Sequence, residues 1–317
     1  MRALILFAVV LSTLFTQAHA HRGGSDRDDA PRHGHETSPP DFVTTPLLVI
    51  GASYANGHTP FDGAAGAPLL GLAVAQGQYL SLGDALVRDP GFSGHVVNEA
   101  QASATTDSRP SCRTALYNGA CSLGELDGYD TQLMKALARV YSLSTGAYNA
   151  EYVIITTPND CLHSDAFGIP EADTQMCDDE DMYDVADNLI QVGQMALDLG
   201  LTPIYAPYPA VENLDLELSR QSSLLSWVIT EADYQRLNDI VMDALAVHLP
   251  EALVIDYWSE FTHLGDGLHP DRATVENAAR MILETINYRV EVATPGRSQG
   301  HRRGRGHRRG WERFFNH

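Results

Sequence analysis

Hydrophobic positions between residues 42 and 294 follow two alternating patterns. Short apolar runs, each bounded by Gly, Pro, Asn or Asp, predict buried strands; they are Leu47–Ile50, His95–Asn98, Tyr152–Thr156, Thr202–Ala206 and Leu253–Tyr257. Between and after these runs, apolar residues recur three or four positions apart, as the buried face of a helix requires. The clearest stripes are Met182/Val185/Leu189/Val192/Met195/Leu199, Tyr234/Leu237/Val241/Leu245/His248 and Val275/Ala279/Ile282/Ile286.

The predicted order is strand then helix, five times over. This alternation is typical of an α/β fold in which a parallel sheet of five strands is covered by helices on both faces. A chain of 317 residues with 44% hydrophobic content can bury a full core. Because no repeat period is present, we expect one domain, residues 42–294, with functional groups at the carboxyl ends of its strands.

The two ends of the chain differ from this domain. Residues 1–20 have a basic start, an apolar run and a small-residue exit, which predicts a signal peptide cleaved after Ala20 and a secreted or periplasmic protein. Residues 21–41 are polar and rich in His, Gly and Pro, so we expect a disordered linker, although its histidines offer metal ligands. No later apolar stretch is long enough to span a bilayer.

Charge separates the domain from the last 23 residues. Residues 295–317 hold 7 basic and 1 acidic residue, which leaves 14 basic and 40 acidic residues for the rest of the chain. Because this acidic remainder of the chain, called here the acidic body, repels polyanions, nucleic acid is excluded as the expected partner. The basic Gly/Arg/His-rich tail is expected to be disordered, and either an anionic polymer or the acidic body itself is a candidate for its partner.

Cysteine usage agrees with export. An even number of cysteines in an exported chain predicts disulfides, with free buried thiols as the alternative. Of the three possible pairings we favour the local one, Cys112 with Cys121 and Cys161 with Cys177. Neither the spacing nor the nearby histidines indicate zinc.

Candidate catalytic residues lie near the two ends of the domain. Ser53 follows the first predicted strand, where a serine is either a nucleophile or a helix N-cap. Near the other end, "HLGDGLHPD" places Asp266 three residues before His269, with Pro270 in the predicted first turn of the next helix. An activated serine needs an imidazole to take its proton and a carboxylate to orient that imidazole. The alternative is that Asp266 forms a turn and His269 caps the helix.

These residues carry a family resemblance. "VIGASYANG" resembles the first sequence block of the SGNH or GDSL hydrolases, G-D-S-x-x-x-G, with Gly51, Ser53 and Gly57 in place, and "DGLHPD" resembles their last block. "VVNEAQASATT" is similar to the second block, N-x-x-x-x-G-x-T, and "IITTPND" to the third, G-x-N-D. The four blocks stand in the family's order across essentially the whole domain.

The resemblance implies a fold and a mechanism. The fold would be the three-layer α/β/α, flavodoxin-like, doubly wound five-stranded parallel sheet of SGNH hydrolases. Ser53 would be the nucleophile, His269 the general base and acid, and Asp266 the orienting carboxylate. The backbone N–H groups of Ser53 and Ser103 and the side-chain amide of Asn159 would form the oxyanion hole, with no metal or organic cofactor.

Three departures from the family pattern bear on the rate. Ala52 stands where the first block has Asp, Ser103 where the second has Gly, and Thr157-Pro158 where the third has Gly. A side chain at position 103 could constrain the backbone, although a main-chain N–H is still available there. These three departures keep open an alternative interpretation, in which the chain is a catalytically impaired surface module or carbohydrate-binding module with the SGNH fold.

The expected substrate is a small-molecule or polysaccharide-linked ester with a short acyl or acetyl group, hydrolysed by a monomer. The segment Cys161–Asp181 follows Asn159 and is a candidate lid, and its end, "CDDEDMYD", either offers carboxylates to calcium or begins a helix. Because no strongly apolar cap segment is present, a long-chain lipase is a second alternative only.

A rival fold for a serine hydrolase is the α/β-hydrolase fold. It is disfavoured because it expects the motif G-x-S-x-G, whereas position 55 is Ala.

Overall fold

The computed structural model describes residues 45–56, 80–110, 125–162, 175–223 and 227–293. The predicted signal peptide, linker and basic tail lie outside the described residues, as do Gly57, Cys112 and Cys121. Among the described helices, none combines the length and the apolar character that crossing a membrane requires.

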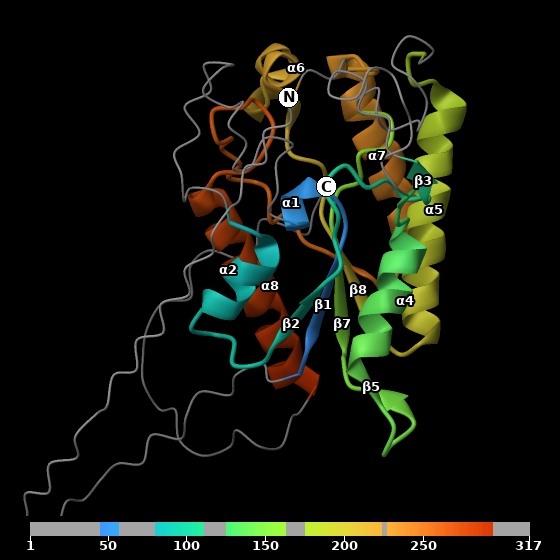
Figure 1. Cartoon of the computed structure of the whole chain (residues 1–317), viewed down its shortest axis with the longest axis vertical. Coiled ribbons are helices and arrows are strands. Elements are labelled where there is room, and N and C mark those ends of the chain that lie inside the picture. The colour runs from blue at the N-terminus through green and yellow to red at the C-terminus, as the bar shows by residue number, and fades with distance from the viewer. Residues whose placement is uncertain (1–44, 57–79, 111–124, 163–174, 224–226, 294–317) are drawn as a thin grey trace, which may run out of the picture. The chain divides into compact units, whose positions relative to one another are not determined.

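The core is a five-stranded parallel sheet with strand order β2-β1-β7-β8-β9 (Figure 1). This is the flavodoxin-like order, in which the first strand lies between the second and the third. The strands are β1 (Leu47–Ile50), β2 (Val96–Asn98), β7 (Tyr152–Ile155), β8 (Thr202–Tyr205) and β9 (Leu253–Val254). The predicted fold class is therefore confirmed, and four of the strands are shorter than the apolar runs that predicted them.

Helices cover both faces of the sheet, as Figure 1 shows. Because successive strand residues point to opposite faces, Leu47 and Val49 pack with helices α2 and α8, whereas Leu48 and Ile50 pack with α4, α5 and α7. The bounds are α2 (Leu82–Arg88) and α8 (Arg272–Ala293) on one face, and α4 (Tyr129–Val140), α5 (Asp179–Asp198) and α7 (Glu231–His248) on the other.

The remaining described elements are short. Helix α1 (Ser53–Asn56) follows β1, and η4 (Val211–Asn213) and α6 (Leu216–Ser223) follow β8. Two hairpins are formed by β3 (Arg109–Pro110) with β4 (Glu125–Leu126), and by β5 (Tyr141–Ser142) with β6 (Ala147–Tyr148).

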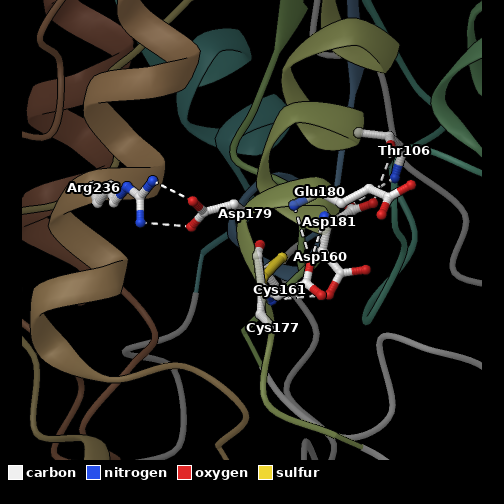
Figure 2. The surroundings of a disulfide bond; sticks show 9 residues. Thr106, Asp160, Cys161, Cys177, Asp179, Glu180, Asp181 and Arg236 are labelled. Carbon is white, nitrogen blue, oxygen red and sulfur yellow. Dashed lines mark hydrogen bonds and ion pairs between the residues drawn. A yellow bond between two sulfur atoms is a disulfide. The ribbon is translucent and has the colours of Figure 1, made fainter.

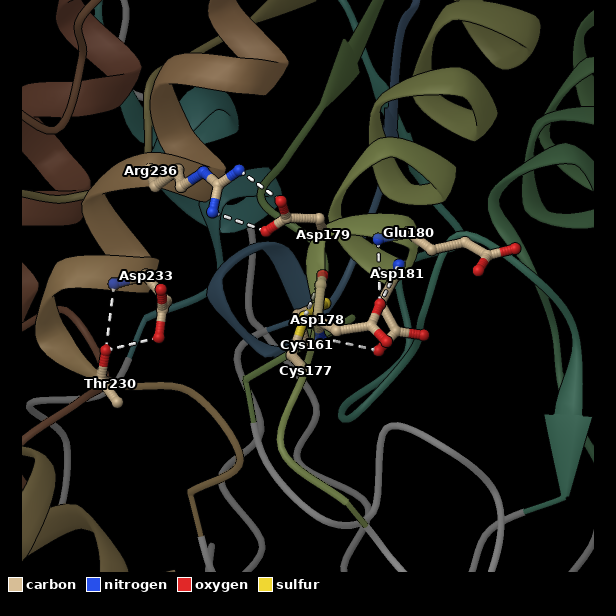
Figure 3. Close-up of polar contacts among 9 residues, drawn as sticks. All are labelled: Cys161, Cys177, Asp178, Asp179, Glu180, Asp181, Thr230, Asp233 and Arg236. Carbon is tan, nitrogen blue, oxygen red and sulfur yellow. Dashed lines mark hydrogen bonds and ion pairs between the residues drawn. A yellow bond between two sulfur atoms is a disulfide. The ribbon is translucent and has the colours of Figure 1, made fainter.

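Helix α5 begins within the acidic run "CDDEDMYD". The sequence left two interpretations of these carboxylates open, as calcium ligands or as the start of a helix. Asp178 Oδ1 accepts from the backbone N–H groups of Glu180 and Asp181, and the Asp181 side chain accepts in return from Asp178 N (Figure 3). This capping box satisfies backbone groups that a helix start leaves open. Asp179 also forms an ion pair with Arg236 of α7. The helix-start interpretation therefore accounts for these carboxylates.

A disulfide joins Cys161, shortly after β7, to Cys177, two residues before α5 (Figure 2). The prediction for this pair is confirmed, and both residues are buried. The bond closes a loop with a sequence separation of 16. A covalent link of this kind stabilises a fold mainly by restricting the unfolded chain.

Replacing both cysteines, in Cys161→Ala/Cys177→Ala, is expected to lower the free energy of unfolding by about 3 kcal/mol, the loop-entropy value for a loop of about this length. Urea unfolding of variant and wild type without reductant measures the difference. Equal free energies of unfolding would contradict a stabilising role for the bond.

Candidate active site

The predicted oxyanion-hole residues follow three neighbouring strands. Ser53 comes three residues after β1, Ser103 five after β2 and Asn159 four after β7. Because β1 lies between β2 and β7 and all three are parallel, their carboxyl ends lie at one edge of the sheet. The chain passes to opposite sides of β1 at this edge, which makes it the topological switch point where doubly wound folds bind ligands.

Backbone hydrogen bonds join the three loops beyond the strands. Gln101 N donates to Gly51 O at 3.0 Å, Thr156 N to Ile50 O at 3.1 Å, and Asn159 N to Ala104 O at 3.2 Å. The first two bonds extend the pairing of β1 with β2 and β7, and the third joins the loops after the two outer strands, β2 and β7, to each other.

Gly51 makes the turn that leads from β1 to Ser53. Its φ of +142° is rarely adopted by other residues, and a Cβ at this position would overlap Oγ1 of Thr156. Gly51 N donates to Oε1 of Gln132, a completely buried side chain of α4, at 2.8 Å. Gln132 could not be identified from the sequence, since 81 residues separate it from Gly51.

Ser53 is buried and is the first residue of α1. Ala52 O accepts from the backbone N–H groups of Ala55 and Asn56, so Ala52 occupies the cap position. The alternative interpretation of Ser53 as an N-cap is therefore wrong. Ala52, which stands where the family's first block has Asp, is itself buried.

Asp266 and His269 form a buried pair. His269 Nδ1 lies 2.6 Å from Asp266 Oδ2, and each residue is only 5% exposed. Asp266 Oδ1 accepts from the backbone N–H groups of Leu268, at 3.0 Å, and His269, at 2.9 Å. The short spacing therefore allows one carboxylate to fix both the backbone and the imidazole of the same loop.

The electrostatics of this pair favour an ionised carboxylate. Burial raises the pKa of the Asp266 carboxyl, but the charge of His269 and the hydrogen bonds from His269 and the backbone outweigh it, so that the pKa lies below its usual value of 3.8. Asp266 is consequently negative at neutral pH and can hold a proton on Nδ1 of the imidazole.

The helix after this loop starts later than the sequence predicted. Helix α8 begins at Arg272, and Asp271 Oδ1 accepts from Thr274 N at 2.8 Å. Pro270 therefore precedes the helix instead of standing in its first turn, and His269 does not cap it. Pro270 forms an antiparallel bridge with His263, and Leu264 N donates to His269 O at 2.8 Å. These bonds close the loop that presents His269.

Tyr54 connects the Ser53 turn to the His269 loop, a role that no sequence pattern indicated. Its hydroxyl donates to Leu268 O at 2.9 Å, and its ring centre lies 6.1 Å from that of His269 in an edge-on arrangement. Trp258 packs against the same tyrosine ring at 5.6 Å. The residue next to Ser53 thus touches the loop that carries the imidazole, although 214 residues separate Tyr54 from Leu268.

Asn159 is buried and oriented by the loop after β2. Its backbone N–H and its side-chain Nδ2 both donate to Ala104 O, each at 3.2 Å. A side-chain amide has two N–H groups, and this bond uses one of them. The second N–H gives Asn159 the donor capacity that an oxyanion hole needs.

Asp160 anchors the next part of the same loop. Its carboxylate accepts from the backbone N–H of Thr106, at 2.8 Å, and from its hydroxyl, at 2.7 Å (Figure 2). Burial raises the pKa of Asp160 from 3.8 to about 6, although the hydrogen bonds from Thr106 and the charge of Arg109 act against that rise. Asn188 of α5 donates to the Thr106 hydroxyl at 3.1 Å.

A cavity of about 240 Å³ adjoins Asp160 on the side of α5. Its lining includes four carboxyl groups, one guanidinium and one amide, from Asp107, Asp160, Asp181, Asp184, Arg109 and Asn188. Cys161, Cys177 and Asp181 place potential metal ligands close together, but the two sulfur atoms are bonded to each other. This trio is therefore a disulfide beside a helix cap and does not form a metal centre.

Comparisons with known proteins return likenesses of structure alone. No protein-family model and no curated protein matches the sequence. A solved structure from Agrobacterium tumefaciens, provisionally described as an arylesterase, is 12% identical, with 77% of this chain and 99% of that chain covered and a TM-score of 0.48. An acetylxylan esterase from Geobacillus stearothermophilus is 14% identical, with coverages of 78% and 96% and a TM-score of 0.40.

A third similar structure, from Desulfitobacterium hafniense, is provisionally described as a lipolytic protein of the G-D-S-L family. It is 13% identical, with 76% of this chain and 99% of that chain covered and a TM-score of 0.41. Structural similarity at these sequence identities and TM-scores does not establish activity, so the functional proposal rests on the side chains described above. In its four sequence blocks and in its strand order, the chain is similar to the SGNH hydrolases.

Proposed function

We propose that the chain is an exported serine hydrolase that cleaves carboxylic esters. Ser53 is the nucleophile, His269 the general base and acid, and Asp266 the orienting carboxylate. The single observation that carries the proposal is the buried pair of His269 and Asp266, held at 2.6 Å in a loop that contacts the residue next to Ser53. A buried carboxylate beside Nδ1 leaves Nε2 of the same ring able to accept a proton.

The reaction proceeds in two steps. The Ser53 hydroxyl attacks the ester carbonyl while His269 takes its proton, and the alcohol leaves with that proton as the acyl-enzyme forms. His269 then takes a proton from water as the water attacks the acyl-enzyme, and it returns that proton to the Ser53 oxygen as the bond to the acyl group breaks and the acid is released. In each step the carbonyl oxygen becomes negative and is stabilised by the N–H groups of Ser53, Ser103 and Asn159.

The favoured substrates carry short acyl or acetyl groups, on small alcohols or on polysaccharides. Support comes from the surroundings of Asn159, since the next residue, Asp160, lines a cavity with three further carboxyl groups, and burial of a long alkyl chain beside such groups is unfavourable. Export is supported by the signal-like residues 1–20 and by the disulfide between Cys161 and Cys177. We expect the enzyme to act as a monomer.

A series of p-nitrophenyl esters of increasing acyl length tests this proposal. We expect kcat/KM to be highest for acyl groups of about two to four carbons, because burying a longer alkyl chain beside carboxyl groups is unfavourable. Hydrolysis is measured by release of p-nitrophenolate, with the Ser53→Ala variant as the blank. A maximum at about twelve carbons would favour a lipase, and no hydrolysis of any ester would favour a carbohydrate-binding module.

A further inference from the structure

Ser103 has a backbone conformation that is unfavourable for a serine. Its φ is +67°, in the left-handed region, and it stands where the second SGNH sequence block has glycine. Residues with a side chain occupy this region at a cost in free energy, and they remain there only where surrounding groups hold them. The groups that hold Ser103 therefore control the direction of its N–H.

Arg109 supplies such a group. Its side chain is buried, and its guanidinium donates from Nη2 to Ser103 O at 2.6 Å and from Nε to Thr105 Oγ1 at 3.1 Å. A third bond runs from Nη1 to Pro110 O at 3.1 Å. Because the guanidinium is planar and rigid, these bonds fix the loop at two points, one on each side of Ala104.

Ala104 is the residue that orients Asn159. Its carbonyl oxygen accepts from both the backbone and the side-chain nitrogen of Asn159, each at 3.2 Å. A change in the backbone between Ser103 and Thr105 would therefore move two of the three oxyanion donors together, the N–H of Ser103 and the amide of Asn159.

We propose that Arg109 is the positioning residue of the oxyanion hole, holding Ser103–Thr105 in the conformation that a glycine at position 103 would adopt without strain. This inference rests on the proposed function. Arg109 acts through the loop and does not touch the substrate. Without its guanidinium, Ser103 relaxes toward negative φ, and both donors turn from the developing oxyanion.

The variant Arg109→Met is expected to lower kcat for p-nitrophenyl acetate by about 10²–10³-fold, the usual loss for one oxyanion donor, with KM changed less than about threefold. The affinity for a boronic acid that forms a tetrahedral adduct with serine should fall in parallel with kcat. Rates are expressed per serine titrated with a fluorophosphonate, so that unfolded protein does not contribute. Arg236→Met, which removes a half-exposed arginine bonded to Asp179, is the matched control and should retain the wild-type kcat.

A second substitution distinguishes positioning from general damage to the fold. Since glycine reaches positive φ without strain, Ser103→Gly added to Arg109→Met should recover at least about tenfold of the lost kcat. A cavity or an unpaired carbonyl left by Arg109→Met would not be repaired by that change. If Arg109→Met does not fold, Arg109→Lys takes its place, with an expected loss of about tenfold because an ammonium lacks the rigid fork.

The experiments distinguish failure of the proposed function from failure of the positioning role of Arg109. Loss of ester hydrolysis in wild type, or its persistence in Ser53→Ala, would overturn the proposed function. The positioning role alone would be overturned if the wild type is active, Ser53→Ala is inactive and the tested arginine variant keeps the full kcat per titrated serine. An Arg109→Met rate that Ser103→Gly does not raise would overturn it as well.

Discussion

Replacing Ser53 by alanine is expected to lower kcat for p-nitrophenyl acetate by roughly 10⁵–10⁶-fold, the scale of loss when a serine hydrolase is deprived of its nucleophile. The hydroxyl is the atom that forms the acyl-enzyme, and no other group in the proposed mechanism can replace it. Steady-state rates at several protein concentrations measure the residual activity. Because Ser53 is a small buried residue, the thermal midpoint should change little.

Ser142→Ala is the matched control for this experiment. Ser142 lies in the β5–β6 hairpin, at the end of the sheet away from α1 in Figure 1, and its hydroxyl contacts that of Ser144. Its kcat should equal that of wild type. A Ser53→Ala protein that keeps more than about a tenth of the wild-type kcat would contradict the assignment of the nucleophile.

Replacing Asp266 by asparagine is expected to lower kcat by about 10⁴-fold with little loss of stability. The asparagine oxygen can still accept from the N–H groups of Leu268 and His269, so the loop keeps its shape. Its NH₂ group, however, faces Nδ1 of His269 and favours the tautomer with a proton on Nε2, which cannot take the proton of Ser53. Stopped assays of kcat, together with thermal unfolding, measure the two effects separately.

Asp271→Asn provides the control, because asparagine is as good an N-cap as aspartate and the bond from Thr274 N is retained. It should change neither kcat nor the thermal midpoint appreciably. An Asp266→Asn enzyme within about tenfold of wild type would show that the carboxylate does not orient the imidazole.

The sequence predicts the sheet well because its strands are short, mostly apolar and separated by helical stripes. The strands β1 and β7 are buried on both faces, and the carboxyl ends of parallel strands gather the residues that follow them. That is why Ser53, Ser103 and Asn159 could be assigned to one edge before the structure was known. The Asp266 and His269 pair could also be predicted, because both residues belong to one loop.

The supporting residues could not be predicted, since their partners are distant in sequence or defined by backbone geometry. Gln132 reaches Gly51 across 81 residues, and Tyr54 reaches Leu268 across 214. Arg109 lies only six residues from Ser103, but its role depends on the positive φ of Ser103, which no spacing rule reveals for a serine. The start of α8 was misplaced because Pro270 also fits the position before an aspartate cap.

The central claim is that Ser53 becomes a nucleophile when folding brings His269 and Asp266 to it. Peptide mass spectrometry after treatment with an ethyl fluorophosphonate tests it most directly, since such reagents label an activated serine and leave ordinary hydroxyl groups intact. The account predicts one adduct, on Ser53, in the wild-type protein and none in the His269→Ala variant. Ester hydrolysis by a protein whose adduct lies on another residue, or equal labelling of Ser53 in His269→Ala, would contradict it.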